Sequence, residues 1–385
     1  MFELCSGLRR FQQVPDTSDR SFFPFFGIQI YMEEKQMERP IRIGLVGLGR
    51  AGFGMHRNEL STRQDKFQFY AVCDIIKERT EPFVEQFGSK AYTDYEEMLK
   101  DDGVELVSIA TRSCDHFAHA KMALLAGKDV MLEKPFCMHP EQSKELIALG
   151  SQPAGPHLYI RHNRRFEKGF KKAMEIIDSG ILGNVFEIKL TRNSYQRRCD
   201  WQTISEFGGG QLLNWGPHII DHSLRFCGGA YTDMYSAIRH VAAAGDCEDH
   251  IKIVFTGVNG RIVDMEISGG AALPTPEYRV YGSRGALVSD DGFFKARYLD
   301  PNVELAPIKA DPETPGASAG FGNNEKLQWI EEDIPFGDGD GTASIWDHLY
   351  ETIRHGKKYP IALSEALAVI EVIEKVKENT IFQNK

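Results

Sequence analysis

The sequence predicts an α/β domain with a doubly wound parallel sheet, followed by an α+β domain with a mainly antiparallel sheet. Two observations support this prediction. Between residues 41 and 149, short apolar runs alternate with helical patterns at connections of a few residues, which is typical of parallel strands joined by helices. After residue 185, strand patterns follow one another across short turns, which is typical of antiparallel pairing with helices covering one face.

The elements of the first domain are expected in alternation. Its strands are predicted at Ile41–Val46, Phe67–Cys73, Leu106–Ala110 and Val130–Leu132, and its helices at Gly52–Ser61, Glu78–Phe87, Tyr95–Lys100, His116–Ala126 and Pro140–Leu149. Farther along, strands are predicted at Leu158–Arg161, Phe186–Leu190, Ile251–Phe255, Arg261–Ile267 and Tyr278–Tyr281, and helices at Lys168–Ser179 and Ser364–Asn379.

These patterns divide the chain into four segments. Residues 1–38 form an extension, which we interpret as disordered or as translation begun upstream of the natural start, because Met32 and Met37 directly precede the first strand. Residues 39–153 form the parallel-sheet domain, which ends in the Pro- and Gly-containing stretch Ser151–Pro156. Residues 154–362 form the second domain, and residues 363–385 form a C-terminal helix expected to pack back on the first.

Charge and composition disfavour several classes of partner. The 385 residues carry a formal net charge of -10, which repels nucleic-acid phosphates and anionic lipid. No apolar run reaches the length needed to cross a bilayer. The seven cysteines are odd in number, scattered and without a C-x-x-C pair, which argues against a disulfide framework or a zinc knuckle. We therefore expect a cytoplasmic protein with small-molecule ligands, and neither nucleic acid nor membrane as a partner.

The first functional motif is a G-x-G-x-x-G sequence made by Gly47, Leu48, Gly49, Arg50, Ala51 and Gly52. It follows an apolar strand and opens a predicted helix, which is the context of a dinucleotide-binding Rossmann domain. The first glycine permits the tight turn, the second lets a pyrophosphate approach the backbone, and the third lets helix and strand pack closely. The alternative is a glycine-rich turn without a ligand.

Asp74 ends the next predicted strand, 22 residues after Gly52, and is the candidate acceptor for the adenosine ribose hydroxyls. A phosphate of NADP 4 Å from this carboxylate would be repelled by about 1 kcal/mol in water and about 4 kcal/mol at an effective dielectric of 20. Because about 1.4 kcal/mol is tenfold in affinity, we predict NAD in preference to NADP. Lys77 would soften the repulsion, and in the alternative interpretation Asp74 only starts a turn.

The next candidate is the Glu133-Lys134-Pro135 turn, which follows another strand of the same sheet. In open α/β sheets, ligands lie outside the carboxyl ends of the strands. Lys134 is therefore placed to donate to a substrate oxygen and to the nicotinamide ribose. An exposed turn lysine is the alternative.

A further signal lies at residues 208–221, where three glycines precede a predicted helix. That helix carries Asn214 and His218 four residues apart, on one face. A histidine can take the hydroxyl proton that must leave when an alcohol loses hydride.

With these motifs the chain resembles the Gfo/Idh/MocA family, which includes glucose–fructose oxidoreductase and inositol dehydrogenase. The resemblance extends from about Ile41 to the C-terminal helix, and it rests on the glycine loop, on A-G-K-D-V-M-L-E-K-P at 126–135, on N-R-R-F at 163–166 and on G-G-G…N-W-G-P-H-I-I-D at 208–221. It implies a Rossmann domain plus an α+β domain with a large, mostly antiparallel open sheet. It also implies sugars, inositols or related polyols as substrates, and a homodimer or homotetramer formed through the open sheet face.

Three catalytic residues follow from the resemblance. Lys134 matches the lysine that contacts substrate and cofactor, and His218 matches the histidine proposed to take the hydroxyl proton. Asn214 stands where many active dehydrogenases have aspartate. Because asparagine offers a neutral and weaker hydrogen bond, either His218 works with a lower pKa, or Asn214 binds substrate, or the proton path is altered.

The remaining predicted contacts extend this set. Thr111-Arg112-Ser113 replaces the family's T-P-N segment, which touches the cofactor, and His116 matches a helix-starting histidine for which a structural role is the natural one. The predicted cofactor contacts are the glycine loop, Asp74, Thr111, Arg112, His116, Glu133 and Lys134. The predicted substrate contacts are Lys134, Arg164, Trp201, Asn214 and His218.

Two local patterns have competing interpretations. His218 and His222 are spaced like helical metal ligands, but no third ligand is placed by the sequence, so no metal is predicted. Trp201 lies in a loop ahead of the glycines and could stack on a sugar ring, while a solvated loop is an equal alternative.

The sequence thus predicts an NAD-dependent oxidoreductase that moves hydride between a sugar, inositol or related polyol hydroxyl and the nicotinamide. Lys134 orients the oxygen, and His218 is the acid/base. Two alternatives stay open. One is an NAD-using glycosidase or lyase that works by transient oxidation without net redox change, and the other is a non-catalytic NAD-binding regulator.

Overall fold

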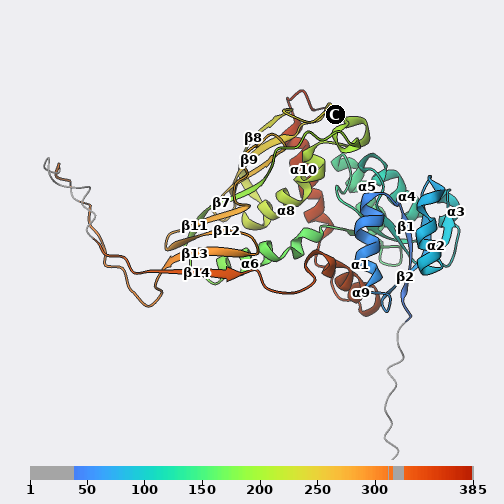
Figure 1. The fold of residues 1–385 in the computed structure, drawn as a ribbon, viewed down its shortest axis with the longest axis horizontal. Helices are drawn as coiled ribbons and strands as arrows, with labels where there is room; N and C mark the ends of the chain where they lie inside the picture. The colour runs from blue at the N-terminus through green and yellow to red at the C-terminus, as the bar shows by residue number, and fades with distance from the viewer. Residues whose placement is uncertain (1–38, 311, 315–324, 384–385) are drawn as a thin grey trace, which may run out of the picture. The chain divides into compact units, whose positions relative to one another are not determined.

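Two sheets organise the residues that the computed structural model describes, which are 39–310, 312–314 and 325–383 (Figure 1). The first sheet has the strand order β3-β2-β1-β4-β5-β6, and the second has the order β14-β13-β12-β11-β7-β10-β9-β8. This architecture confirms the predicted fold class. The predicted extension at 1–38 lies outside the described residues.

The strands of the first sheet all pair in parallel and are β1 (Ile41–Val46), β2 (Phe67–Cys73), β3 (Lys90–Tyr92), β4 (Leu106–Ile109), β5 (Asp129–Leu132) and β6 (Leu158–Ile160). Their connections contain a short π-helix, η1 (Gly52–His56), and the α-helices α1 (Arg57–Ser61), α2 (Glu81–Phe87), α3 (Tyr95–Leu99), α4 (His116–Leu125) and α5 (Pro140–Gly150). The central strands are apolar on both faces because helices cover both sides of such a sheet; Ile41, Ile43 and Leu45 of β1 are fully buried.

The strand β6 changes the predicted domain organisation. It follows the predicted boundary at residue 153, yet its residues Leu158 and Ile160 pair with Val130 and Leu132 of β5. The chain therefore crosses to the second domain after β6, not before it. A short apolar strand fits either sheet, so its sequence pattern could not assign it.

The second sheet is antiparallel except where β7 and β10 pair in parallel. Its strands are β7 (Val185–Asn193), β8 (Tyr231–Arg239), β9 (His250–Gly257), β10 (Ile262–Ser268), β11 (Tyr278–Gly282), β12 (Gly285–Ser289), β13 (Phe293–Leu299) and β14 (Trp329–Pro335). One face is covered by helices that include α6 (Lys168–Asp178) and α8 (Gly216–Phe226), and alternate residues such as Ile251, Ile253 and Phe255 are fully buried.

The last two helices pack against the first domain, and the second of them also contacts the second domain. Ile345 and Trp346 of α9 (Ile345–His355) are buried in the same apolar cluster as the β1 residues. The C-terminal helix α10 (Leu363–Lys377) packs against α5 of the first domain and α8 of the second (Figure 1). Within the described residues, none of the helices combines the length and the apolar character needed to cross a bilayer.

Candidate active site

The glycine loop between β1 and η1 forms a cradle that side chains would fill. A Cβ atom on Gly47, whose φ is +85°, would lie 2.8 Å from the backbone of Ala110 and Thr111. A Cβ atom on Gly52 would lie 2.1 Å from the carbonyl oxygen of Gly47, whereas the space above Gly49 is open. Tight packing at the first and third glycines and open backbone at the second are what a dinucleotide pyrophosphate requires, so these residues fit the cofactor.

Asp74 lies at the carboxyl end of the adjacent strand and is held by backbone donors. Its Oδ2 accepts from Leu48 N at 2.8 Å, and its Oδ1 accepts from Ile76 N at 2.9 Å. The half-exposed guanidinium of Arg79 also lies 3.5 Å from Oδ2. The sequence prediction considered Lys77 and missed Arg79, although a basic residue five positions after the acid was a visible signal.

The predicted cofactor contacts after β4 form a loop held by side chains. His116 places Nδ1 at 2.7 Å from the carbonyl oxygen of Pro135 and Nε2 at 3.3 Å from that of Thr111. Burial lowers the pKa of His116, while its contacts with the two carbonyl oxygens oppose the shift, and the ring lies between the two loops. The Thr111 hydroxyl lies 3.1 Å from Nδ1 of His119, and the Arg112 guanidinium lies 4.3 Å from the ring centroid of Phe207 in the second domain.

Glu133 anchors the turn that carries Lys134. Its Oε1 accepts from Arg161 at 2.7 Å and lies 2.8 Å from His56 Nε2, while its Oε2 accepts from the backbone N of Lys134 at 3.1 Å. Burial opposes the charge, but Arg161 and His56 hold the pKa of Glu133 well below its ordinary value. Arg161 is itself fully buried and also pairs with Glu59. The carboxylate is therefore engaged with protein groups that fix the turn.

Lys134 connects the two domains. Its Nζ donates to the backbone carbonyl oxygen of Asn214 at 3.0 Å. Burial, together with the positive charges of Arg164 and Arg50, lowers the pKa of Lys134 to about 8, while Glu133 opposes the shift. An amine of this pKa near neutral pH is mostly an ammonium that still has N–H groups to donate.

The glycines ahead of Asn214 allow close packing, and Gly208 lets the second domain approach the first. A Cβ atom on Gly208 would lie 2.7 Å from Ser113 Cβ of the first domain, and one on Gly210 would lie 2.3 Å from the carboxylate of Glu248. The helix predicted next is in fact two helices, α7 (Gln211–Asn214) and α8, which are separated at Trp215. Pro217 lacks the N–H that a continuous helix would use at this point, so Asn214 and His218 lie on different helices.

His218 is buried and keeps one ring nitrogen available for a hydrogen bond. It is 6% exposed, and its Nδ1 has no hydrogen-bond partner among the described residues. Burial together with the positive charges of Lys134 and Arg164 lowers its pKa well below 6.5. The ring is therefore neutral at physiological pH and can accept a proton.

A second histidine, His162, has a similar environment and was not predicted as a site residue. It is 1% exposed, both ring nitrogens lack a partner among the described residues, and burial lowers its pKa to about 4. It lies two residues after the end of β6, at the carboxyl edge of the first sheet. Its position after a strand was the available signal, which the assignment of that strand to the other domain concealed.

Arg164 takes part in a cluster around Trp215. The guanidinium groups of Arg164 and Arg192 each lie 4.3 Å from the ring centroid of Trp215. Both arginines pair with Glu167, and Arg192 also lies 3.1 Å from Glu277. Burial raises the pKa of Glu277 to about 7, although Arg192 opposes the shift. Sequence analysis found only Arg164 because the other members come from distant elements.

Two other polar residues of α8 are engaged in structural contacts. Oδ1 and Oδ2 of Asp221 accept from Arg165 at 2.5 and 2.7 Å, and the Asp221 side chain is buried. His222 has Nε2 at 3.0 Å from the carbonyl oxygen of Arg164, and its ring stacks on Phe170 with centroids 3.9 Å apart. Among the described residues, no group of three or more His, Cys, Asp or Glu side chains is arranged to hold a metal.

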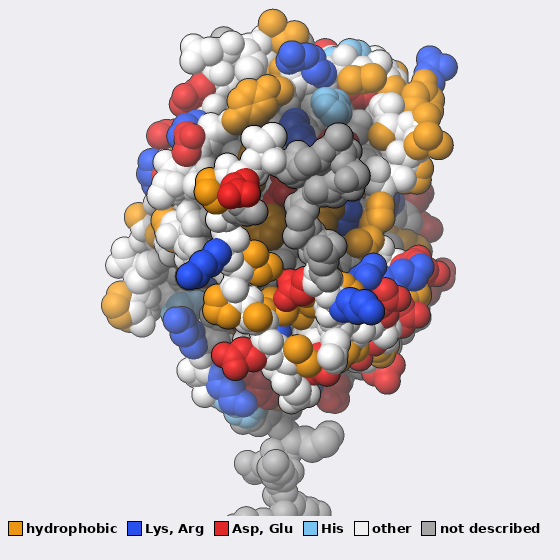
Figure 2. Space-filling model, turned by 90° about the vertical axis from the view of Figure 1, so that its left-hand side faces the viewer, with side chains coloured by type: hydrophobic (Ala, Val, Ile, Leu, Met, Phe, Trp, Pro, Cys, Tyr) orange, Lys and Arg blue, Asp and Glu red, His pale blue; other side chains and the backbone are white. Residues whose placement is uncertain are grey.

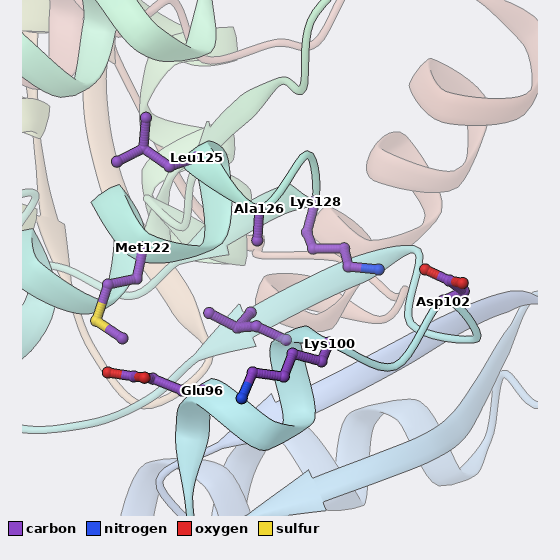
Figure 3. Close-up of a pocket in the computed structure, with 8 residues that line it drawn as sticks. Glu96, Lys100, Asp102, Met122, Leu125, Ala126 and Lys128 are labelled. Atoms are coloured by element: carbon purple, nitrogen blue, oxygen red, sulfur yellow. The ribbon is translucent and has the colours of Figure 1, made fainter.

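One cavity of the described structure lies away from this site (Figure 3). Its volume is about 560 Å³, and it is lined by Glu96, Leu99, Lys100, Asp102, Met122, Leu125, Ala126 and Lys128. The residues just before β4 and β5 belong to this lining, which places it at the amino edge of the parallel sheet. Ligands of such sheets bind at the carboxyl edge, so this surface groove is not the active site.

A glycine cradle, an acid at the end of the next strand, and a lysine that meets the second domain define a dinucleotide-binding oxidoreductase of two domains. The chain belongs to the Gfo/Idh/MocA family. Residues 41–153 match the family model for the oxidoreductase NAD-binding Rossmann fold, and residues 170–288 match a GFO/IDH/MocA C-terminal domain. The predicted resemblance is confirmed.

Several relatives are similar along most of the chain. A scyllo-inositol 2-dehydrogenase (NADP(+)), IolW of Bacillus subtilis, is 27% identical over 349 residues, which cover 88% of this chain and 94% of the relative. An uncharacterized oxidoreductase of Schizosaccharomyces pombe, C26H5.09c, is 32% identical over 304 residues, covering 75% and 79%. A myo-inositol 2-dehydrogenase of Thermotoga maritima is 26% identical over 259 residues, covering 65% and 75%.

Solved structures show the same fold. An NAD-binding protein from Listeria innocua superposes with a TM-score of 0.74 at 22% identity, covering 88% of this chain and 94% of that one. An oxidoreductase from Bacillus cereus superposes with a TM-score of 0.71 at 23% identity, covering 87% and 95%.

Proposed function

We propose that this protein transfers hydride between a secondary hydroxyl of a sugar, inositol or related polyol and the nicotinamide of NAD. The observation that carries the proposal is the 3.0 Å hydrogen bond from Lys134 Nζ to the backbone of Asn214. It joins the lysine at the cofactor edge of the first domain to the segment that precedes His218. Relatives named as inositol and glucoside dehydrogenases support the substrate class.

The residues divide the chemistry among them. NAD, when bound, supplies the hydride acceptor; the loop from Gly47 to Gly52 would hold its pyrophosphate, and Asp74 its adenosine ribose. The Lys134 ammonium donates a hydrogen bond to the substrate oxygen and stabilises the negative charge that develops there. The neutral His218 accepts the hydroxyl proton, a role that typically contributes about 10²–10⁴-fold to the rate.

A substrate screen tests this proposal. The purified protein is mixed with sugars, uronates and inositols together with NAD or NADP, and the absorbance of the reduced cofactor is followed. We expect at least one polyol to give steady-state reduction of NAD. No reduction of either cofactor by any of these compounds would overturn the proposal.

We also propose that NAD is preferred over NADP because of Asp74. Replacing Asp74 with alanine is expected to reduce the preference for NADH over NADPH at least tenfold. The carboxylate that repels the 2′-phosphate is gone, and Arg79 then faces that phosphate. Fluorescence titrations with NADH and NADPH measure this ratio. Asp65→Ala, at an exposed position, is the matched control. Wild-type protein that binds NADPH as tightly as NADH would contradict the assignment.

For the assembly we propose a homodimer or homotetramer through the open face of the second sheet. Tyr235, Ile262 and Trp329 are 65%, 43% and 40% exposed on strands of this sheet. Figure 2, which views the molecule from the side on which this sheet lies in Figure 1, shows apolar side chains mixed with both signs of charge. Opposite charges on neighbouring strands, such as Lys252 of β9 and Asp264 of β10, form ion pairs. A face of this mixed kind suits contact with its own copy.

A charge placed on this face should separate the protomers. Ile262→Asp is expected to convert the oligomer to a monomer, because a two-fold interface buries the new carboxylate in both copies. Light scattering coupled to size-exclusion chromatography gives the mass. Val84→Asp, at a similarly exposed apolar position on α2, should leave the mass unchanged. A wild-type monomer would show the proposed assembly to be wrong. We further propose a cytoplasmic location, which the odd number and scattered positions of the seven cysteines support.

A further inference from the structure

We propose that Gln202 is a positioning residue that orients the side-chain amide of Asn214 so that it donates a hydrogen bond to the substrate oxygen. The structure shows the amide of Gln202 lying between Arg50 of the glycine loop and Asn214, and so connecting the two domains. The inference rests on the proposed function, because it assigns a substrate contact within the same site.

Two arginines determine which end of Gln202 is the oxygen. Arg50 Nη2 and Arg198 Nη2 each lie 2.6 Å from Gln202 Oε1. A guanidinium has only donors, so the atom that faces both of them must be an acceptor. The reverse orientation of the amide would place an NH₂ group against two donors, and this settles the orientation.

The orientation of Gln202 is passed on to Asn214. Gln202 Nε2 donates to Asn214 Oδ1 at 3.2 Å. The oxygen of the Asn214 amide is thereby occupied, and Asn214 Nδ2 has no hydrogen-bond partner among the described residues. The backbone oxygen of the same residue accepts from Lys134 Nζ. The Asn214 side chain thus has an amide N–H donor available, in the same residue whose backbone oxygen binds Lys134.

This arrangement gives the asparagine a chemical role. An alcohol oxygen becomes negative as its proton moves to His218, and it is stabilised by donors that already face it. Asn214 Nδ2 and the Lys134 ammonium are two such donors, whereas an aspartate at 214 would offer acceptor atoms and a negative charge. The preferred substrate therefore places an oxygen that can accept a hydrogen bond against Asn214. This oxygen belongs either to the reacting hydroxyl or to the ketone formed from it.

Gln202→Glu tests the orientation with little change in shape. The new carboxylate still accepts from Arg50 and Arg198, but it has no N–H group for Asn214. Asn214 is then expected to reverse its amide, donate to this carboxylate and present its oxygen to the substrate. We expect kcat/KM for the best polyol to fall about tenfold to a hundredfold, while NADH affinity measured by fluorescence changes less than twofold. Glu206→Gln, at an exposed position in the same segment, should be without effect.

A double-mutant cycle separates positioning from general damage to the loop. In an Asn214→Ala background, Gln202→Glu should change kcat/KM less than twofold, because the group through which it acts is missing. An undiminished effect in that background, or wild-type activity of Gln202→Glu alone, would overturn the inference.

An NMR measurement tests the inference without any turnover. The side-chain NH₂ signals of Asn214, assigned by their loss in Asn214→Asp, should shift in Gln202→Glu and stay in place in Glu206→Gln. Unshifted signals would overturn the positioning role, whether or not a polyol substrate is found. A protein that shows the shift but reduces no cofactor would instead contradict the proposed function alone.

Discussion

Replacing Lys134 with methionine is expected to lower kcat for polyol oxidation by about 10²–10⁴-fold. Methionine keeps the length of the side chain but removes the ammonium, which donates to the substrate oxygen as it becomes negative. Most of the affinity for NAD should remain, because the glycine loop and Asp74 hold the distant parts of the cofactor. Stopped-flow and steady-state assays measure kcat, and fluorescence titration measures NADH binding.

The pKa of Lys134 also predicts the direction in which kcat/KM changes with pH. The charged form of Lys134 is the active one, and its pKa is about 8, so kcat/KM should fall as the pH rises through about 8. Between pH 6 and 7 the rate should stay level, because His218 has a pKa well below 6.5 and is already neutral. Lys134→Arg keeps its charge above pH 8, so any residual activity should lack the alkaline decrease.

Two results would contradict this account. One is Lys134→Met protein that retains more than a tenth of wild-type kcat. The other is an increase of kcat/KM through pH 8, which would assign the base to the free amine of Lys134 and not to His218.

Replacing Glu133 with glutamine is expected to lower the free energy of unfolding by about 3–5 kcal/mol. The change removes the charge that pairs with Arg161, which is fully buried, at 2.7 Å. A buried guanidinium that loses a partner keeps the full desolvation penalty of its charge. Because Glu59 still pairs with Arg161, the lower end of this range is expected. Urea unfolding followed by circular dichroism measures the loss.

A matched control uses an exposed ion pair of the same domain. Glu97 accepts from Lys100 at 2.6 Å, and both side chains are largely exposed. Glu97→Gln should leave the unfolding midpoint unchanged within error, because solvent screens such a pair. Equal effects of the two substitutions would show that the Glu133–Arg161 pair has no special importance for stability.

The local parts of the site were predictable because their chemistry is written in contiguous residues. The spacing of Gly47, Gly49 and Gly52 after an apolar strand predicts a phosphate-binding turn, since the steric requirement acts over six positions of one chain segment. Lys134 could be found in the same way, because its turn directly follows a strand whose carboxyl end marks the ligand edge. The roles of these residues stay predictions until the experiments above are done.

Contacts between distant segments could not be read from such patterns. Arg50 reaches Gln202 across 152 positions of sequence. His162 was hidden because its strand was assigned to the other domain. In each case the pairing depends on where two elements meet, and no periodicity of either element records that.

The amino-acid sequence alone determined the fold class, the alternation of strands and helices in the first domain and the glycine turn after β1, because apolar periodicity and glycine sterics act locally. Only the tertiary structure decided that β6 completes the first sheet, that Pro217 separates Asn214 from the helix of His218, and that Gln202 orients the Asn214 amide. Strand pairing and side-chain hydrogen bonds are chosen by competition among all the groups that folding brings together. A buried polar group takes the partner that satisfies it in that competition, and this partner can come from any part of the chain.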